Sequence, residues 1–138
     1  MAHIRIRKFN TKNTYPEQNL DNDLCQAVVT KGGRIVWLRG QCPQNLEDAV
    51  SIASDDPAEQ THKVMKNICQ LIQEAGGEMK HLVKLVVYIT DVRNREPVYR
   101  TIGEYTKGIY PVSTGLVVQA LARPEWLVEI DAIAVIPS

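Results

Sequence analysis

Two carboxylates, Glu129 and Asp131, stand inside an otherwise apolar run near the end of the chain. If residues 127–136 form a strand, alternation puts both carboxylates on one face and only apolar side chains on the other. A carboxylate is costly to bury unless it meets water, a donor or a cation. We therefore expect this end of the strand to reach a cleft or a subunit interface. A desolvated carboxylate there is suited to act as a general base, because desolvation raises its pKa.

Other kinds of reactive site have no pattern in the chain. There is no glycine-rich nucleotide loop, no Walker loop, no nucleophile elbow and no His-Glu-x-x-His motif. The histidines His3, His62 and His81 are too widely spaced to form a metal site on one element. The three cysteines include no Cys-x-x-Cys pair. We expect neither a metal nor a cofactor.

Composition narrows the class of partner. The 138 residues, enough for a single domain over 1–138, carry 16 basic and 16 acidic side chains. A neutral chain has no electrostatic footprint for nucleic acid or for an anionic membrane. No stretch approaches the roughly 20 apolar residues of a membrane span. The three cysteines, an odd number at wide spacings, fit a reducing compartment, so we expect a cytoplasmic protein. We expect its ligand to be a small molecule.

The first third of the chain reads as strands and loops. A period-2 pattern predicts a strand over 3–9, and the polar composition of 10–23 predicts a loop without regular structure. Two strands, 24–30 and 34–39, are predicted to form a hairpin through Lys31-Gly32-Gly33, because glycines allow the positive φ angles of tight turns. Residues 45–55 read as a second loop.

Two helices and two further strand regions follow. Asp56-Pro57-Ala58-Glu59 is a helix start and Gly76-Gly77 a stop, with apolar residues repeating between them at three and four positions. A strand at 81–90, a helix at 95–107 and two last strands complete the order. This order predicts an α+β fold with a mixed sheet and both helices packed on one face. Apolar residues on the other face then favour self-association.

Several segments together resemble one known family. These segments are the run Val128-Glu-Ile-Asp-Ala-Ile-Ala-Val, the strand Cys25-Gln-Ala-Val-Val, the loop Arg39-Gly-Gln-Cys-Pro and the strand from Val83 to Asp91. All four are similar to motifs of the reactive intermediate deaminase (Rid, YjgF-like) superfamily. The resemblance covers roughly residues 10–135. It implies a chorismate-mutase-like fold, a homotrimer whose sheets line a central barrel, and ligand clefts between subunits.

The resemblance also implies roles for single residues. Glu129 matches the glutamate thought to hold the water that attacks an imine; the alternative is a structural ion pair, and Asp131 is expected to be structural. The arginine that clamps the substrate carboxylate in active deaminases is replaced here by Ser113. A serine has no charge and one donor, so we expect poor deamination of 2-aminoacrylate. The remaining expected binding residues are Arg39, Gly40, Gln41, Leu24, Tyr99 and Gly115.

Arg39 has two possible roles. It replaces a family serine in the cleft, so it could return the missing positive charge from the opposite wall. It could equally neutralise Glu129 or Asp131 in a structural salt bridge, which would hold the carboxylate ionised and argue against a general base. Cys42, close by, is expected to be a packed side chain rather than a nucleophile.

We therefore expect a trimer that binds a small anionic or carbonyl- or imine-bearing metabolite in intersubunit clefts and hydrolyses it. The alternative is a trimer that binds or senses such a metabolite without catalysis. A ribonuclease role, sometimes ascribed to the family, finds no support in a neutral chain with no basic stripe.

Overall fold

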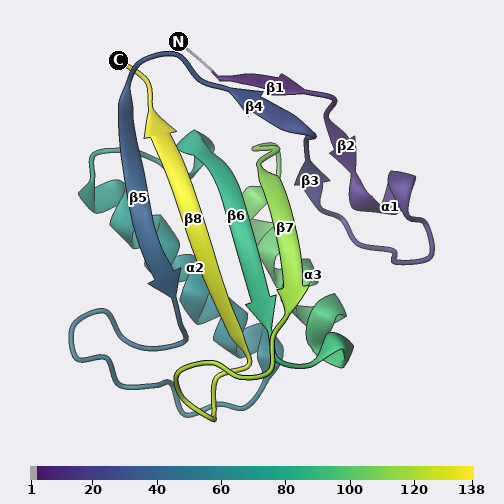
Figure 1. The fold of residues 1–138 in the computed structure, drawn as a ribbon, viewed down its shortest axis with the longest axis vertical. Helices are drawn as coiled ribbons and strands as arrows, with labels where there is room; N and C mark the ends of the chain where they lie inside the picture. The colour runs from purple at the N-terminus through teal and green to yellow at the C-terminus, as the bar shows by residue number, and fades with distance from the viewer. Residues whose placement is uncertain (1–2) are drawn as a thin grey trace.

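In the computed structural model, which describes residues 3–138, the two long helices begin and end close to their sequence signals. Helix α2 (Pro57–Glu74) is capped by the Asp56 side chain, which accepts a hydrogen bond from the backbone N–H of Ala58. It gives way to Gly76, whose φ of +91° suits a residue without a side chain. Helix α3 spans Arg95–Thr106. Both helices lie behind one face of the central sheet (Figure 1).

The central sheet has four strands in the order β5-β8-β6-β7, and it is mixed because only β6 and β7 run parallel. The strands are β5 (Arg34–Gln41), β6 (Leu82–Ile89), β7 (Val112–Val117) and β8 (Val128–Ile136). The short 3₁₀ turns η1 (Met79–His81) and η2 (Val92–Asn94) precede β6 and α3. The mixed sheet with helices on one face agrees with the predicted α+β class.

The core lies between the sheet and the helices. The predicted apolar face of β8 is fully packed there, with Val128, Ile130, Ala132 and Ala134 at most 1% exposed. Met65, Ile68 and Ile72 of α2 meet it and are also fully buried. The opposite face of the sheet carries no helix (Figure 1). Apolar side chains remain open on β5 there, most of all Trp37, which is 73% exposed.

The predicted hairpin between 24–30 and 34–39 is wrong. Gly32 and Gly33 do adopt positive φ angles and reverse the chain. However, β4 (Ala27–Val29) pairs with β1 (Ile4–Ile6), whereas β5 pairs with β8. A turn sets only the direction of the chain, and the long apolar strand β8 offers β5 a far longer ladder than three residues of β4 can.

Two other predictions for this region were also wrong. The expected strand over 3–9 is interrupted at Arg7, which has a positive φ of 56°. The expected loop over 10–23 contains regular structure: the pair β2 (Phe9–Asn10) and β3 (Asp23–Leu24), and a third, short helix, α1 (Thr11–Thr14). The Asn10 side chain caps α1 by accepting from the N–H of Lys12, a local bond that composition alone does not reveal.

This N-terminal arm, residues 4–29, is fastened beside β7 and α3. Buried Asn22 donates its side-chain N–H to the carbonyl of Tyr99 at 2.8 Å. The Asp23 carboxylate accepts from the N–H of Gly108 at 2.8 Å, and the N–H of Cys25 donates to the carbonyl of Pro111 at 3.1 Å. These bonds flank Leu24 and hold it against the start of β7.

Candidate functional site

Glu129 and Asp131 lie on the helix-free face of β8, half-buried, as the alternation predicts. Tyr88 of β6 is paired with Glu129 in the sheet, and its hydroxyl donates to Asp131 Oδ2 at 3.2 Å. The adjacent Asp131 carboxylate raises the pKa of the Tyr88 hydroxyl above its ordinary value. Asp131 thus has a partner within the sheet, in line with a structural role.

A β-bulge in β5 brings Gly40 to the two carboxylates. The register with β8 shifts between Leu38 and Gln41, so Arg39 and Gly40 together face a single β8 position. A side chain at position 40 would overlap the carboxylate of Glu129. The Gln41 side chain donates to the Arg39 carbonyl at 2.9 Å and closes the bulge. Gly40 is therefore the residue that allows Glu129 to lie flat against β5.

Cys42 has a contact with Glu129 that the sequence analysis did not anticipate. Its thiol donates to Glu129 Oε1 at 3.2 Å. Burial, together with the neighbouring Glu129 carboxylate, raises the pKa of Cys42 to about 12. The thiol therefore stays protonated near neutral pH, which makes it a hydrogen-bond donor to Glu129 and not a nucleophile.

Arg39 is exposed on the same face and lines a cavity of about 390 Å³ with Trp37 and Asp131. Within residues 3–138, no ion pair joins Arg39 to Glu129 or Asp131. The structural salt bridge that we considered is therefore absent from the single chain. Arg39 keeps its charge available to the cavity.

The other four predicted binding residues meet in a different cavity, of about 350 Å³, at the β7 edge of the sheet. Leu24 comes from β3, Tyr99 from α3, and Ser113 and Gly115 from β7. The structure thus brings together four residues that lie far apart in the sequence. A side chain at position 115 would overlap the hydroxyl of Tyr99, so the glycine lets the tyrosine reach the strand.

Arg95 also lines this cavity, and the sequence analysis missed it. Its guanidinium lies over the Tyr99 ring, 4.4 Å from the ring centre, and 3.4 Å from where a Gly115 side chain would begin. Burial raises the pKa of the Tyr99 hydroxyl, and the Arg95 charge opposes that rise. The signal in the sequence was the four-residue spacing from Arg95 to Tyr99, which puts both on one side of a helix.

Two features leave this cavity ready for a ligand. No carboxylate of residues 3–138 pairs with Arg95. Gln18 also lines the cavity, and its side-chain oxygen Oε1 is buried and has no hydrogen-bond partner within residues 3–138. The wall therefore offers a cation and a hydroxyl for an acidic group, and an unused acceptor for an N–H or O–H group.

The two groups of predicted residues do not meet within one chain. Gly115 is paired with Val87, which points into the core, so Gly115 and Ser113 belong to the helix side of the sheet. Glu129 belongs to the opposite side and is two strands away, about 10 Å at the usual strand spacing. The chain by itself supplies two half-sites.

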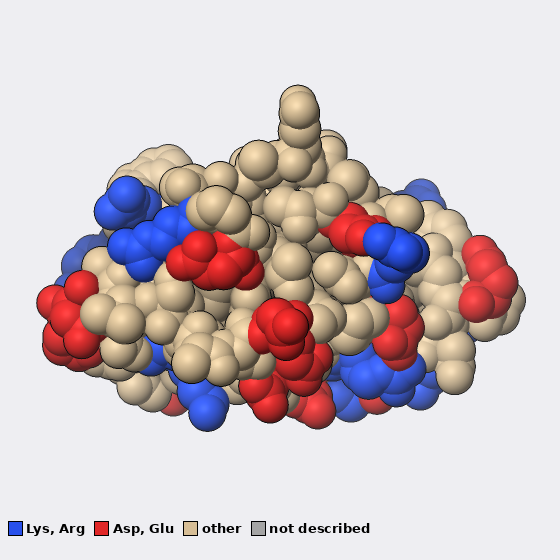
Figure 2. All heavy atoms as spheres, turned by 90° about the horizontal axis from the view of Figure 1, so that it is seen from below, with Lys and Arg blue, Asp and Glu red and all other residues tan. Residues whose placement is uncertain are grey.

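Figure 2 shows the end of the molecule at which β5, β6 and β7 finish, where acidic and basic side chains are intermixed. Such a surface offers no continuous basic stripe for a polyanion. Within residues 3–138 no three histidine, cysteine or acidic side chains are arranged to hold a metal. No helix in that range has the length and apolarity to cross a bilayer.

Comparison with known proteins gives consistent matches over most of the chain. The family model described as endoribonuclease L-PSP matches residues 20–136. Protein DfrA of Myxococcus xanthus is 33% identical over 111 residues, covering 80% of this chain and 82% of that protein. The crystal structure of the Rid-family protein YyfB from Yersinia pestis superimposes with a TM-score of 0.77 at 28% identity, covering 99% of this chain and 100% of that one. The Yersinia pestis Rid-family protein YyfA gives 0.69 at 33% identity, covering 81% and 86%.

Proposed function

The chain belongs to the Rid (YjgF-like) superfamily, and from that premise we propose that it binds a small anionic metabolite bearing a carbonyl or imine group and hydrolyses it. The observation that carries the proposal is the cavity at the β7 edge, where Leu24, Tyr99, Ser113 and Gly115 converge. Arg95 and Ser113 offer a charge and a hydroxyl to an acidic group, and the cavity is of the size expected for a small metabolite.

Glu129 is the residue we propose for the chemical step. A carboxylate can accept a proton from water as the water attacks the carbon of a C=N bond. Addition gives a carbinolamine, and the proton taken from water passes to its nitrogen. The C–N bond then breaks, ammonia or an amine leaves, and the hydroxyl group loses its proton to become a carbonyl. The Cys42 thiol fixes the carboxylate by donating to Oε1, which leaves Oε2 for the water.

We propose a homotrimer, because the two half-sites lie on opposite faces of one sheet and can complete each other only across a subunit boundary. The exposed Trp37 and Ile35 on the open face, 73% and 52% exposed, support burial against another subunit. Mass measurement in solution at micromolar concentration is expected to give three chains per particle. A stable, folded monomer at that concentration would contradict both the assembly and the shared cleft.

The proposal is tested with a panel of imines generated in situ from amino acids by an amino acid oxidase, with ammonia release as the readout. We expect turnover of some members, but slow turnover of 2-aminoacrylate and of similar small imino acids. The reason is that Ser113 cannot clamp a carboxylate from β7, and a lost charged hydrogen bond costs about 1.5 to 3 kcal/mol, or roughly ten- to a hundredfold in rate. A 2-aminoacrylate rate equal to that of an arginine-bearing relative, measured in parallel, would contradict this specificity.

A second candidate is a trimer that binds the metabolite without turning it over. It is favoured by the engagement of Glu129 with the Cys42 thiol, which could serve only to satisfy a half-buried carboxylate. Saturable binding of a panel member with no ammonia release would support this second function. We do not propose ribonuclease activity, because the chain carries equal numbers of basic and acidic side chains, 16 of each, and the two are mixed at the end shown in Figure 2.

A further inference from the structure

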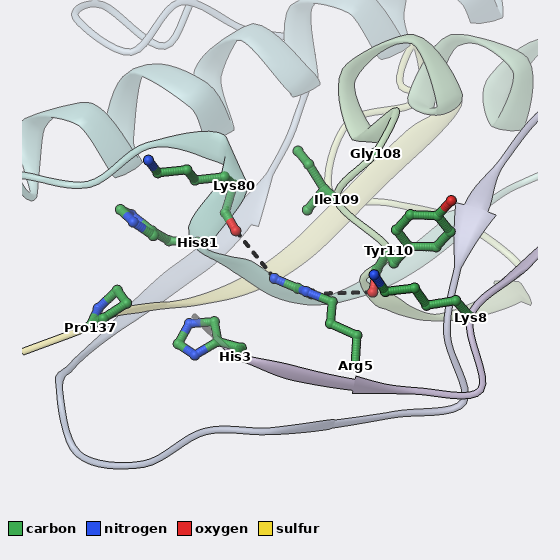
Figure 3. Close-up of a pocket in the computed structure, with 9 residues that line it drawn as sticks. All are labelled: His3, Arg5, Lys8, Lys80, His81, Gly108, Ile109, Tyr110 and Pro137. Carbon is green, nitrogen blue, oxygen red and sulfur yellow. Dashed lines mark hydrogen bonds between the residues drawn. The ribbon is translucent and has the colours of Figure 1, made fainter. Parts of the chain in front are cut away.

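A third cavity, of about 450 Å³, lies where the N-terminal arm passes the loop before β7 and the start of β6. Its walls share no residue with the cavities of Arg39 and Arg95. Figure 3 shows His3 and Arg5 approaching from one side, Lys80 and His81 from another, and Tyr110 beside Lys8. Among its lining residues, all within the described part of the chain, five are basic or histidine and none is acidic.

Arg5 is the central cation of this cavity. Its guanidinium is partly buried and donates to the carbonyls of Tyr110 and Lys80, both at 3.2 Å (Figure 3). In residues 3–138 it forms no ion pair with a carboxylate. Even partial burial removes some of the water around a charge, and two neutral carbonyls replace that hydration only in part. Arg5 is therefore a partly buried cation for which residues 3–138 supply no counterion.

Further donors surround the same space. The Lys8 ammonium lies 4.9 Å from the centre of the Tyr110 ring and has no ion pair within residues 3–138. His81 Nδ1 accepts the N–H of Glu78 at 3.0 Å, so the imidazole is neutral and carries its proton on Nε2 as a donor. Burial lowers the pKa of His81 and favours this neutral form. Lys80 adds a charge, although Glu78 lies 3.3 Å from its ammonium.

The cavity also has an apolar side, formed by Ile109, Pro137 and the Tyr110 ring. Arg5 and Lys8 supply two positive charges that no carboxylate of residues 3–138 pairs with, and the single charge of one carboxylate would balance only one of them. A phosphate monoester has three terminal oxygens and close to two negative charges at neutral pH. We propose that this cavity is a second binding site that takes a small phosphate monoester, with the phosphate on Arg5 and Lys8 and the organic group against Tyr110.

The test uses phenyl phosphate as the probe, with benzoate as its carboxylate counterpart, followed by calorimetry and by the ring resonances of the histidines. We expect saturable binding of phenyl phosphate at about millimolar concentration or below. The resonances of His3 and His81 are expected to shift, whereas those of His62, on helix α2, are not. Benzoate is expected to bind at least about tenfold more weakly, since it has one charge and two oxygens.

The variants are Lys8→Gln and, as a matched control, Lys66→Gln, which removes an exposed lysine from α2. Lys8→Gln is expected to weaken phenyl phosphate binding about five- to tenfold, and Lys66→Gln to leave it unchanged. Arg5→Lys is a supporting variant, because loss of its two carbonyl bonds could unfold the arm. The proposal would be overturned by any one of four results: absence of saturable phenyl phosphate binding, equally tight binding of benzoate, a shift of the His62 resonances alone, or equal effects of the two lysine variants on binding.

Discussion

Replacing Arg95 by glutamine is expected to weaken the binding of small carboxylates at the β7-edge cavity by roughly ten- to a hundredfold. The guanidinium is the only permanent cation among the described residues that line this cavity. Losing a charged hydrogen bond costs about 1.5 to 3 kcal/mol, which corresponds to that range of affinity. Calorimetric titration with pyruvate and with the neutral analogue acetone measures the effect. The neutral analogue should bind equally to both proteins.

Arg100→Gln is the matched control for this prediction. Arg100 lies on the same helix, is exposed, and pairs with Glu96 instead of facing the cavity. Its replacement should leave carboxylate affinity unchanged, and both variants should melt within a few degrees of the wild type, because each removes a partly solvated charge. Equal loss of affinity in the two variants would mean that Arg95 acts only through the overall charge of α3.

Local sequence signals were sufficient for α2 and β8. The start of α2 is encoded by Asp56 and Pro57 and its end by Gly76, so capping and helix period act on the same short segment. The alternation in β8 predicts its two faces, and the structure buries one and leaves Glu129, Asp131 and Ile133 of the other half-buried, although Val135 at the end of that face is buried. In both elements the decisive interactions lie within a few residues, or follow from hydrophobic burial alone.

The N-terminal arm could not be predicted in this way. Its strands are short, and their pairing depends on the rest of the sheet. Because β5 pairs with β8, β4 is left to pair with β1. The bonds that fix the arm join residues far apart in the chain, such as Asn22 with the carbonyl of Tyr99. Pairings of such separation carry no local pattern.

The candidate site likewise combines residues that the sequence could indicate with residues that depend on long-range packing. Motif resemblance indicated the residues Leu24, Tyr99, Ser113 and Gly115, and the structure places them around one cavity. It could not indicate Arg95, because the role of that arginine depends on α3 packing beside a glycine of β7. The bond from Cys42 to Glu129 depends likewise on a bulge in β5 that alternation does not foresee.

Changing Glu129 to glutamine is expected to lower turnover of a panel substrate by about a hundred- to ten-thousandfold, the usual contribution of a positioned general base. Glutamine keeps the size of the side chain and still accepts from the Cys42 thiol, so the fold should persist. Binding of the same substrate should change little, because Glu129 is proposed to hold the attacking water, whereas Arg95 and Ser113 of the adjoining half-site hold the acidic group. The effect should therefore fall on kcat rather than on KM, as steady-state kinetics will measure.

Asp131→Asn provides the matched control, since it removes an equal charge from the same face of the same strand. Asp131 already accepts from Tyr88, so its loss should alter the pKa of that tyrosine more than it alters the rate. Cys42→Ser retains a donor to Glu129 and should keep most of the activity, whereas Cys42→Ala should lose more. If Glu129→Gln and Asp131→Asn reduce kcat equally, the negative potential of the face, and not proton transfer at Glu129, would account for the rate. Full activity in Glu129→Gln would exclude Glu129 as the base.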